Sequence, residues 1–409
     1  MPFTSGTVPG FSGATGLMQT LVNYMAGSTY SDNLGTGNGV TLLFNKMLAN
    51  TPVAKGNCRV RFKIAGVIYQ VWDNGEGIFT HTKVSASSID YNTGAISLTF
   101  TQAIDNGYVM GILYSTATNG EGRDWVIILN QNSKNSTGAD AFPGDNPKEV
   151  VLKNSGPSYK EEILIGMREF KYVAGNHYGI QLNIYKQWRD VEEAATVPWN
   201  SNSADTGNAG YDATRNNWGT HPGCPLNDAS MAYWFFVNKR RIIVIARVAG
   251  TIYEGFYLGG GIRFSSPSKY PHPMVAAGTV GESVSTFSSI AASHSFFIWP
   301  QQVPGCFLSI LPNDTYDKGT NVTFLPKQDF ASAGTLKKTT TGDIILYPVY
   351  LMQRLVSPFQ LLMEMDGPAF TPFTTLQAEN TLTEGADTYF IVQNIFRTTY
   401  QDYMGIKQV

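Results

Sequence analysis

The sequence has 409 residues, of which 43% are hydrophobic and only 15% are charged, and its formal net charge is −2. A chain of this length is expected to form two or three domains and to bury a sizeable core. The near-neutral charge argues against a nucleic-acid-binding protein, which needs a basic surface to displace counterions from phosphates. No signal peptide is recognisable, and the longest apolar runs are too short to cross a bilayer, so we expect no membrane insertion. The three cysteines are too sparse for a disulfide framework.

Residues 1–30 are expected to form an N-terminal arm followed by a short helix. Gly, Ser, Thr and Pro dominate the first sixteen residues, which predicts a tether that becomes ordered only on binding a partner. Leu17, Leu21 and Met25 then recur at helical spacing, which predicts an amphipathic helix over about 16–26. Its apolar face is expected to pack in the core, with docking on a partner as the alternative.

Residues 31–118 show the pattern of a small β-domain. From Arg59 to Ile64 apolar residues alternate with basic ones, which is typical of a strand buried on one face. The dipeptide Ala65-Gly66 predicts a hairpin to a second strand, Val67–Trp72. "GAISLTF" and "YVMGILYST" add two more strands. We expect a small β-sandwich or barrel.

Residues 119–409 are expected to form a larger antiparallel β-sandwich, so the fold class is mainly β with few short helices. The strongest signal is the stretch 232–258, where three apolar runs joined by "NKR" and "AG" predict an antiparallel meander. Two segments, 188–228 and 266–342, lack a regular pattern and are expected to be long loop insertions. The second of these contains strand candidates at "FFIWP" and "VTFLP".

Three consecutive glycines, Gly259, Gly260 and Gly261, follow the last run of this meander. A phosphate-binding loop would need a Lys-Ser/Thr pair at fixed spacing and a helix after it. The pair is missing, and a helix is disfavoured by three nearby prolines, Pro267, Pro271 and Pro273. We therefore predict a structural turn, in which the glycines let the strand bend or let neighbouring backbone approach closely.

No constellation typical of catalysis or metal binding is apparent. His221 and Cys224 make half of a zinc pattern without a second pair, and we expect them in a solvent-exposed loop. The adjacent acids Glu161 and Glu162 would face opposite sides of a strand, which predicts solvated edge residues, not a glycosidase pair. "DNGEG" at 73–77 resembles a cation loop, but its spacing favours a turn. We expect no catalytic residue, no metal and no cofactor, and a protein that is not an enzyme.

The insertion 188–228 carries large aromatic residues among Asn, Asp and Gly. This composition suits stacking on sugars, and it equally suits a protein–protein interface. In a β-rich chain with few charges we favour the interface. The candidate contact residues are Trp188, Trp199, Tyr211 and Trp218.

Several segments of the sequence resemble segments of known proteins. "SSIDYNTGAISLTF" (87–100) is similar to a small β-module of tail and baseplate proteins of tailed bacteriophages, in which a "DY-x-TG" turn precedes an alternating strand. "DWVIILN" with "VVLKNSGPSYKEEILIGMREF" resembles a segment of uncharacterised phage virion proteins. "NKRRIIVIARVAGTIYEGFYLGGGIRFSSPSKYPHPMVAAG" and the C-terminal "FIVQNIFRTTYQDYMGI" are similar to the same proteins.

The resemblance implies a structural protein of the phage tail tip or baseplate, located in the virion after assembly in the host cytoplasm. Its expected partners are other tail or baseplate proteins and copies of itself in a homo-oligomer. The resemblance brings no catalytic residues. Two alternatives stay open: a receptor-binding tail protein that recognises a host-surface glycan, and a hydrolase of cell-envelope polysaccharide.

Overall fold

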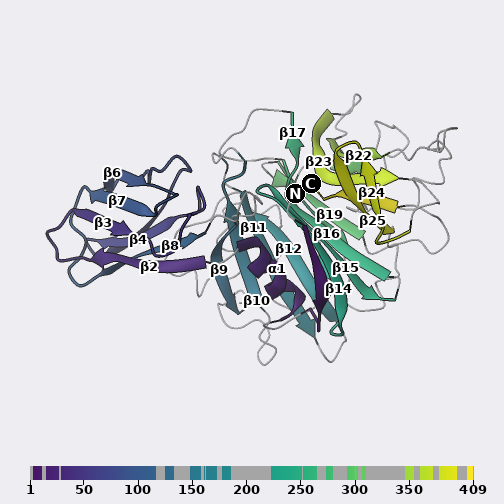
Figure 1. Ribbon diagram of the computed structural model, residues 1–409, viewed down its shortest axis with the longest axis horizontal. Helices are drawn as coiled ribbons and strands as arrows, with labels where there is room; N and C mark the ends of the chain where they lie inside the picture. The colour runs from purple at the N-terminus through teal and green to yellow at the C-terminus, as the bar shows by residue number, and fades with distance from the viewer. Residues whose placement is uncertain are drawn as a thin grey trace.

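A computed structural model describes residues 3–11, 15–26, 29–116, 125–132, 148–157, 161, 163–172, 177–185, 223–250, 252–264, 273–279, 293–299, 301–302, 306–309, 346–353, 360–371, 377–393 and 403–408. The fold is mainly β, as the sequence predicts, and its sheets are antiparallel. Within these residues no helix is long and apolar enough to cross a bilayer. Figure 1 shows a small domain at one side of a larger body.

The largest sheet has twelve strands in the order β1-β14-β15-β16-β18-β13-β12-β11-β10-β9, with β19 paired to β18 and β20 paired to β19. Its strands are β1 (Phe3–Val8), β9 (Val126–Asn132), β10 (Lys148–Asn154), β11 (Ile163–Tyr172), β12 (His177–Tyr185), β13 (Gly223–Pro225), β14 (Met231–Val237), β15 (Arg241–Ala249), β16 (Ile252–Gly260), β18 (Met274–Thr279), β19 (Ser293–Trp299) and β20 (Gln301–Gln302).

One face of this sheet encloses the only helix of the described residues, α1 (Leu17–Ala26). The predicted helix and its core role are confirmed, because Leu17, Leu21 and Met25 are fully buried. They share one apolar cluster with side chains from β10–β12 and from β14–β16. Two distant parts of the sheet therefore face the same helix (Figure 1).

A second sheet covers the opposite face of β14–β16. Its strand order is β21-β22-β23-β26-β25-β24, and β17 pairs with β23. The meander prediction is confirmed, and its middle strand β15 is buried on both sides: Ile242 and Val244 enter the first core, while Ile243 and Ile245 enter the second. The strands of this sheet are β17 (Ile262–Arg263), β21 (Cys306–Ser309), β22 (Tyr347–Gln353), β23 (Gln360–Thr371), β24 (Thr381–Glu384), β25 (Asp387–Gln393) and β26 (Tyr403–Lys407).

The small domain is a sandwich of two sheets around its own apolar core. One sheet has the order β2-β8-β4-β5 and the other β3-β7-β6. The predicted alternation is confirmed, because Val60, Phe62 and Ile64 are buried in this core. Its strands are β2 (Thr29–Thr36), β3 (Leu43–Met47), β4 (Arg59–Ile64), β5 (Val67–Trp72), β6 (Val84–Ile89), β7 (Ala95–Phe100) and β8 (Val109–Ser115).

The small domain is inserted into the larger one, which differs from the expected order of arm, small domain and large domain. Strand β1 pairs with β14 along its whole length, so residues 3–8 are an edge strand of the large sheet and not a free tether. Phe3 contacts Phe236 with ring centroids 5.1 Å apart, and this contact helps to hold the strand. The chain leaves the large domain after α1 and returns to it at Trp125. The backbone N–H of Trp125 donates to the Met25 carbonyl across 3.3 Å.

Side-chain contacts join the two domains close to these connections. Lys153 of β10 places its Nζ 4.2 Å from the centre of the Trp72 ring. Ser155 donates from its hydroxyl to the Gly56 carbonyl across 3.0 Å. The small domain is therefore attached at one end, and the rest of it projects from the body (Figure 1).

Two sequence motifs of the small domain, the turn at 90–94 and "DNGEG" at 73–77, are explained by their hydrogen bonds. Asp90 accepts hydrogen bonds from the N–H groups of Asn92 and Thr93, and Gly94 adopts a φ of 73°. Tyr91 donates to the buried carboxylate of Asp73 across 2.6 Å. Asp73 also accepts from three backbone N–H groups, those of Gly56, Cys58 and Gly75. "DNGEG" is thus a turn, as predicted, and the carboxylate of Asp73 holds the surrounding backbone through these hydrogen bonds.

Candidate functional site

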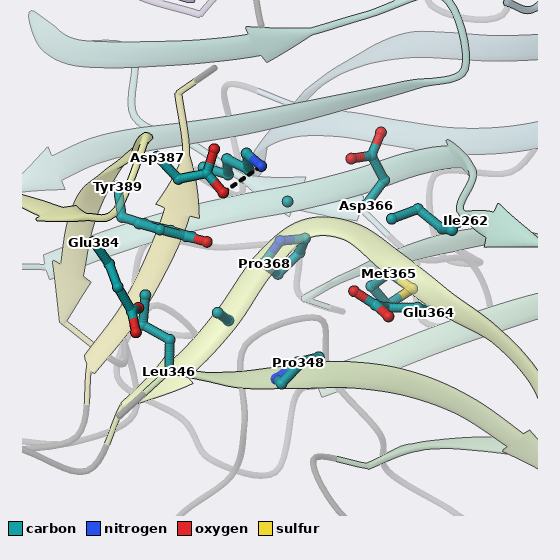
Figure 2. A pocket seen from close by; sticks show the side chains of 13 residues that line it. Ile262, Leu346, Pro348, Glu364, Met365, Asp366, Pro368, Glu384, Asp387 and Tyr389 are labelled. Carbon is teal, nitrogen blue, oxygen red and sulfur yellow. Dashed lines mark hydrogen bonds and ion pairs between the residues drawn. The ribbon is translucent and has the colours of Figure 1, made fainter. Parts of the chain in front are cut away.

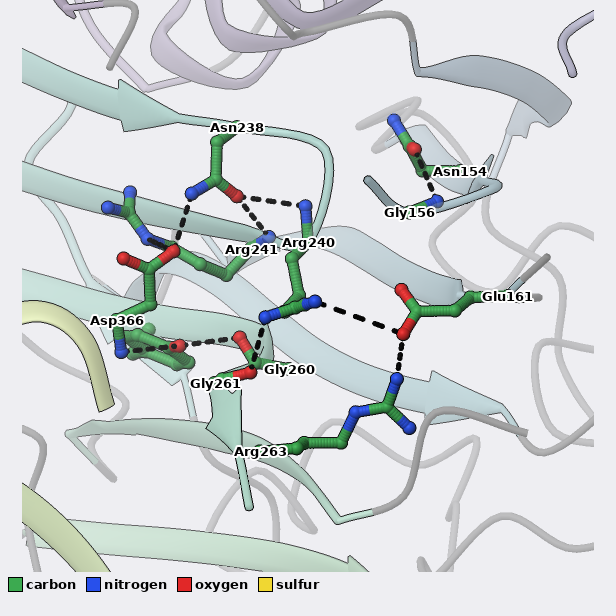
Figure 3. A network of polar contacts seen from close by, with 11 residues as sticks. Asn154, Gly156, Glu161, Asn238, Arg240, Arg241, Gly260, Gly261, Arg263 and Asp366 are labelled. Carbon is green, nitrogen blue, oxygen red and sulfur yellow. Dashed lines mark hydrogen bonds and ion pairs between the residues drawn. The ribbon is translucent and has the colours of Figure 1, made fainter. Parts of the chain in front are cut away.

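The turn between β14 and β15 is held by the side chain of Asn238. Its Oδ1 accepts the backbone N–H groups of Arg240 at 2.8 Å and Arg241 at 2.9 Å. Its Nδ2 donates to Oδ2 of Asp366 in β23 across 2.5 Å. One amide therefore closes the turn and ties it to the second sheet, as Figure 3 shows.

Arg241 follows directly and is fully buried, although it carries a charge. Its Nε lies 3.4 Å from Oδ2 of Asp366, and its Nη1 donates to the Phe236 carbonyl across 2.6 Å. A buried guanidinium is tolerated because a carboxylate and a carbonyl replace its water. The charge of Asp366 is thereby committed to Arg241 and Asn238.

The three glycines lie beside this turn, and the predicted close approach of backbone is confirmed for two of them. A Cβ on Gly259 would collide with the Arg240 carbonyl oxygen, and its φ of 126° is strained for any other residue. A Cβ on Gly261 would collide with the Glu364 carbonyl oxygen of β23. At Gly260 it would meet only the Arg240 side chain, 3.0 Å away. Gly259 and Gly261 are therefore the structurally demanding positions.

Hydrogen bonds also hold this glycine segment in place. Gly260 donates its N–H to the Arg240 carbonyl across 3.0 Å, and Arg240 donates from Nη1 to the Gly261 carbonyl across 3.1 Å. Tyr257 donates its hydroxyl to the Gly260 carbonyl across 2.7 Å. Burial raises the pKa of Tyr257 well above its usual value, and the nearby Asp366 adds to the shift. The hydroxyl therefore stays protonated and remains a donor.

A second ion-pair group extends the cluster toward β10. Glu161 has a fully buried side chain, and its Oε1 pairs with Arg263 of β17 and lies 4.0 Å from Nη2 of Arg240. Its Oε2 is turned toward Gly156, where a Cβ would collide with it. The expectation that Glu161 is a solvated edge residue is wrong, because two arginines neutralise it inside the protein.

Together these residues join parts of the chain that are far apart in sequence. The polar cluster, defined as Glu161, Asn238, Arg240, Arg241, Arg263 and Asp366, connects the β10–β11 link, the β14–β15 turn, β17 and β23. Every member contacts another charged or polar group of the protein. The cluster therefore fixes how the second sheet sits on the first, and its geometry is structural.

An open pocket of about 570 Å³ lies next to this cluster, on the second sheet. Its side chains come from β17, β22, β23, β24, β25 and β26 or from their ends (Figure 2). It is lined by Ile262, Leu346, Pro348, Glu364, Met365, Asp366, Gly367, Pro368, Ala369, Glu384, Asp387, Tyr389 and Lys407. This volume is within the range of pockets that hold small molecules or protein side chains.

The charge of the pocket is predominantly negative. Asp387 is paired with Lys407, whose Nζ lies 2.6 Å from Oδ2, and Asp366 is held by the polar cluster. Burial raises the pKa of Glu364, and the negative charge of Asp366 raises it further. Burial and Asp387 likewise raise the pKa of Tyr389. The lining residues include four carboxylates, those of Glu364, Asp366, Glu384 and Asp387, against the single ammonium of Lys407, so an incoming cation would be stabilised here.

Such a pocket suits an amine or a guanidinium better than a phosphate or a carboxylate. Its apolar surfaces, such as Ile262 and Leu346, can contact the aliphatic stem of a lysine or an arginine. Among the residues that the structure describes, no group of three or more His, Cys, Asp or Glu is arranged to hold a metal ion. The pocket is thus a candidate site for a positively charged side chain.

The structure tests only part of the site predicted from sequence. Trp188, Trp199, Tyr211 and Trp218 lie outside the described residues, as do Pro267 and Pro271. Pro273 is buried and immediately precedes β18. His221 also lies outside the described residues. We expected Cys224 in a solvent-exposed loop, and this expectation is wrong. Cys224 is buried in β13, and burial raises the pKa of its thiol.

The polar cluster and the pocket were both missed by sequence reasoning. Two signals pointed to them: Arg241 opens a strand whose next residues are all apolar, and "MEMDG" places two acids in an apolar strand. A charge inside an apolar strand predicts a buried partner, but not its identity. The partners of Arg241 and Glu161 lie 125 and 102 positions away, so only the folded chain reveals them.

No protein-family model and no curated protein matches this chain.

Proposed function

We propose that the chain is a structural subunit of a bacteriophage virion, of the tail or baseplate type, which acts through contacts between subunits. One observation carries the proposal: a compact β-sandwich is inserted between α1 and β9 and projects from the larger domain (Figure 1). A projecting domain attached at one end offers a separate surface for a neighbouring subunit. Such an arrangement suits a symmetric assembly.

The segments that resemble phage virion proteins support the same proposal. Residues 87–100 form a turn and a core strand of the inserted sandwich, and the described residues of 238–278 include β15, β16 and the three glycines. Their side chains build cores, turns and the polar cluster. The likeness thus falls on residues that determine shape. We propose on this basis that the protein is not an enzyme and that its partners are virion subunits.

Mass spectrometry of gradient-purified virions tests this function. The phage whose genome encodes the chain is grown, and peptides of the chain are quantified against those of its major capsid and tail proteins. We expect the chain in intact particles at a fixed ratio to the tail proteins. Peptides found only in the infected lysate would contradict a structural role, and a hydrolase released from the cell would give that pattern.

A further inference from the structure

The outer face of the inserted sandwich carries a row of cations. Along β4 the apolar residues point into the core, so Arg59, Arg61 and Lys63 point outward. On the neighbouring strands they are flanked by Leu113 and Gly111 of β8, and by Trp72, Gln70 and Ile68 of β5. Arg59 lies over the Trp72 ring at 5.5 Å, near the large domain. Arg61 is exposed and lies further along the projecting face.

On β8, next to Arg61, no side chain of the described residues covers the outer face of the sheet. Gly111 is its partner across the strands, and a Cβ placed on Gly111 would have no atom within 4 Å. Two residues away, Val109 exposes 53% of its surface on the same side. An exposed valine, a bare glycine and a row of cations make a surface that is basic, partly apolar and open to a partner.

The pocket on the second sheet has the complementary chemistry. Glu364, Glu384 and Asp387 give it negative charge, and only Lys407 opposes them among its lining residues. Ile262 at its edge is 43% exposed, and Phe264, two residues on, is 60% exposed. An acidic hollow beside exposed apolar side chains fits a basic surface with exposed apolar side chains.

These two surfaces lie on different parts of the molecule. The inserted sandwich projects at one side of the large sheet, whereas β22–β25 lie beyond the other side in Figure 1. The basic face and the pocket therefore do not meet within one chain, but they can meet between two. A contact between unlike surfaces of identical chains is heterologous, and it generates a ring or a helical stack.

We infer that the outer face of β5, β4 and β8 docks on the acidic pocket of a second copy of this chain, with Arg61 directed toward Glu364 and Glu384. This inference rests on the proposed structural role and names the partner in that assembly. The contact is electrostatic in large part, so it weakens as salt is raised from about 50 to about 500 mM.

Charge reversal on each side tests the contact in the full-length protein. Arg61→Glu makes the basic face repel the pocket, and Glu384→Lys makes the pocket repel the basic face. Sedimentation velocity at low salt measures the dissociation constant of self-association. We expect each single variant to raise it at least tenfold, because like charges then meet in every contact.

An equimolar mixture of the two variants provides the decisive test of the contact. In an alternating assembly the glutamate introduced by Arg61→Glu meets the lysine introduced by Glu384→Lys, and the second contact is that of the unaltered protein. The equimolar mixture should therefore regain self-association to within about threefold of the unaltered protein, as expected for a complementary charge pair. Lys46→Glu, an equal charge change on the exposed edge strand β3, should leave the constant unchanged.

Gly111→Glu supplies a second variant whose folding is not in question, because open space surrounds that position. It should weaken self-association as Arg61→Glu does. A monomeric unaltered protein, single variants without effect, or a mixture as weak as its components would each overturn the inference. These results are separable from the structural role, which is judged by the presence of the chain in purified virions.

Discussion

Asn238 and Asp366, which are 128 residues apart, are joined by a hydrogen bond of 2.5 Å from the amide nitrogen to the carboxylate. The oxygen of the Asn238 amide closes the β14–β15 turn, and the carboxylate of Asp366 also neutralises the buried Arg241. This hydrogen bond therefore helps to hold the first sheet and the second sheet in one relative arrangement.

Replacing Asn238 by alanine should lower the stability of the large domain. The change removes two hydrogen bonds within the turn and the bond to Asp366, all partly buried. We expect the free energy of unfolding in urea to fall by about 2 kcal/mol. Asn227→Ala is the matched control, because Asn227 makes longer bonds of 3.2 and 3.4 Å before β14. An equal loss in both variants would argue against the linking role of Asn238.

Alanine substitutions at Gly259, Gly260 and Gly261, where β16 ends before β17, should rank in a fixed order. Gly259→Ala and Gly261→Ala force a methyl group against backbone oxygen, and we expect losses of about 2–3 kcal/mol in the free energy of unfolding. Gly260→Ala should cost less, because the Arg240 side chain can move aside. Gly250→Ala, with a φ of 51° and open space around it, reports backbone strain alone. If Gly260→Ala proves the most damaging, this description of the three glycines is wrong.

The inserted sandwich should be separable from the rest of the chain. The N–H of Trp125 reaches the carbonyl of Met25, and Thr29 lies opposite Ser115 in the β2–β8 ladder, so both pairs of ends are adjacent. We expect a chain in which 27–124 is replaced by a short Gly-Ser linker to keep a cooperative thermal transition. Residues 29–116 expressed alone should fold too, as a chain with its own apolar core. Aggregation of both pieces would contradict the insertion.

The isolated sandwich should lose stability as pH rises through the acid range. Burial raises the pKa of Asp73, while its hydrogen bonds, with Tyr91 first, offset part of the shift. Because the folded state binds the proton more tightly than the unfolded state, the stabilisation is present at low pH and is lost as pH rises through the raised value.

Trp72 is the only tryptophan in 29–116, and its fluorescence reports unfolding. The free energy of unfolding of the unaltered domain, minus that of Asp73→Asn, should decrease between about pH 3.5 and pH 7. The asparagine variant supplies the reference because it does not titrate. A difference that grows over this range would show that the hydrogen bonds to Asp73 outweigh its burial.

The local elements were predictable because their signals are local. Alternation in β4, helical spacing in α1 and the Ala65-Gly66 hairpin depend on neighbouring residues, and each is found as predicted. The sequence of β1, "FTSGTV", favours a tether because it carries little apolar surface. It is a strand because β14 offers a free edge and Phe236 offers a ring for Phe3, and both are tertiary facts.

The polar cluster and the pocket depend entirely on such long-range contacts. Glu161 and Arg263 look like ordinary charged residues of irregular or edge segments until the sheets are stacked. The position of the sandwich as an insertion has the same origin: the sequence predicts a domain boundary near 118, but only the pairing of β1 with β14 shows that the residues before the sandwich belong to the large sheet.

The central claim, our proposal that this chain is a subunit of a phage tail or baseplate, is tested most directly by a cryo-electron microscopy reconstruction of the tail of the phage proposed to encode it. The account predicts several symmetry-related copies of this chain in the tail or baseplate, with the inserted sandwich of each copy against a neighbouring subunit. A well-resolved tail and baseplate whose density is fully accounted for by other proteins would contradict it.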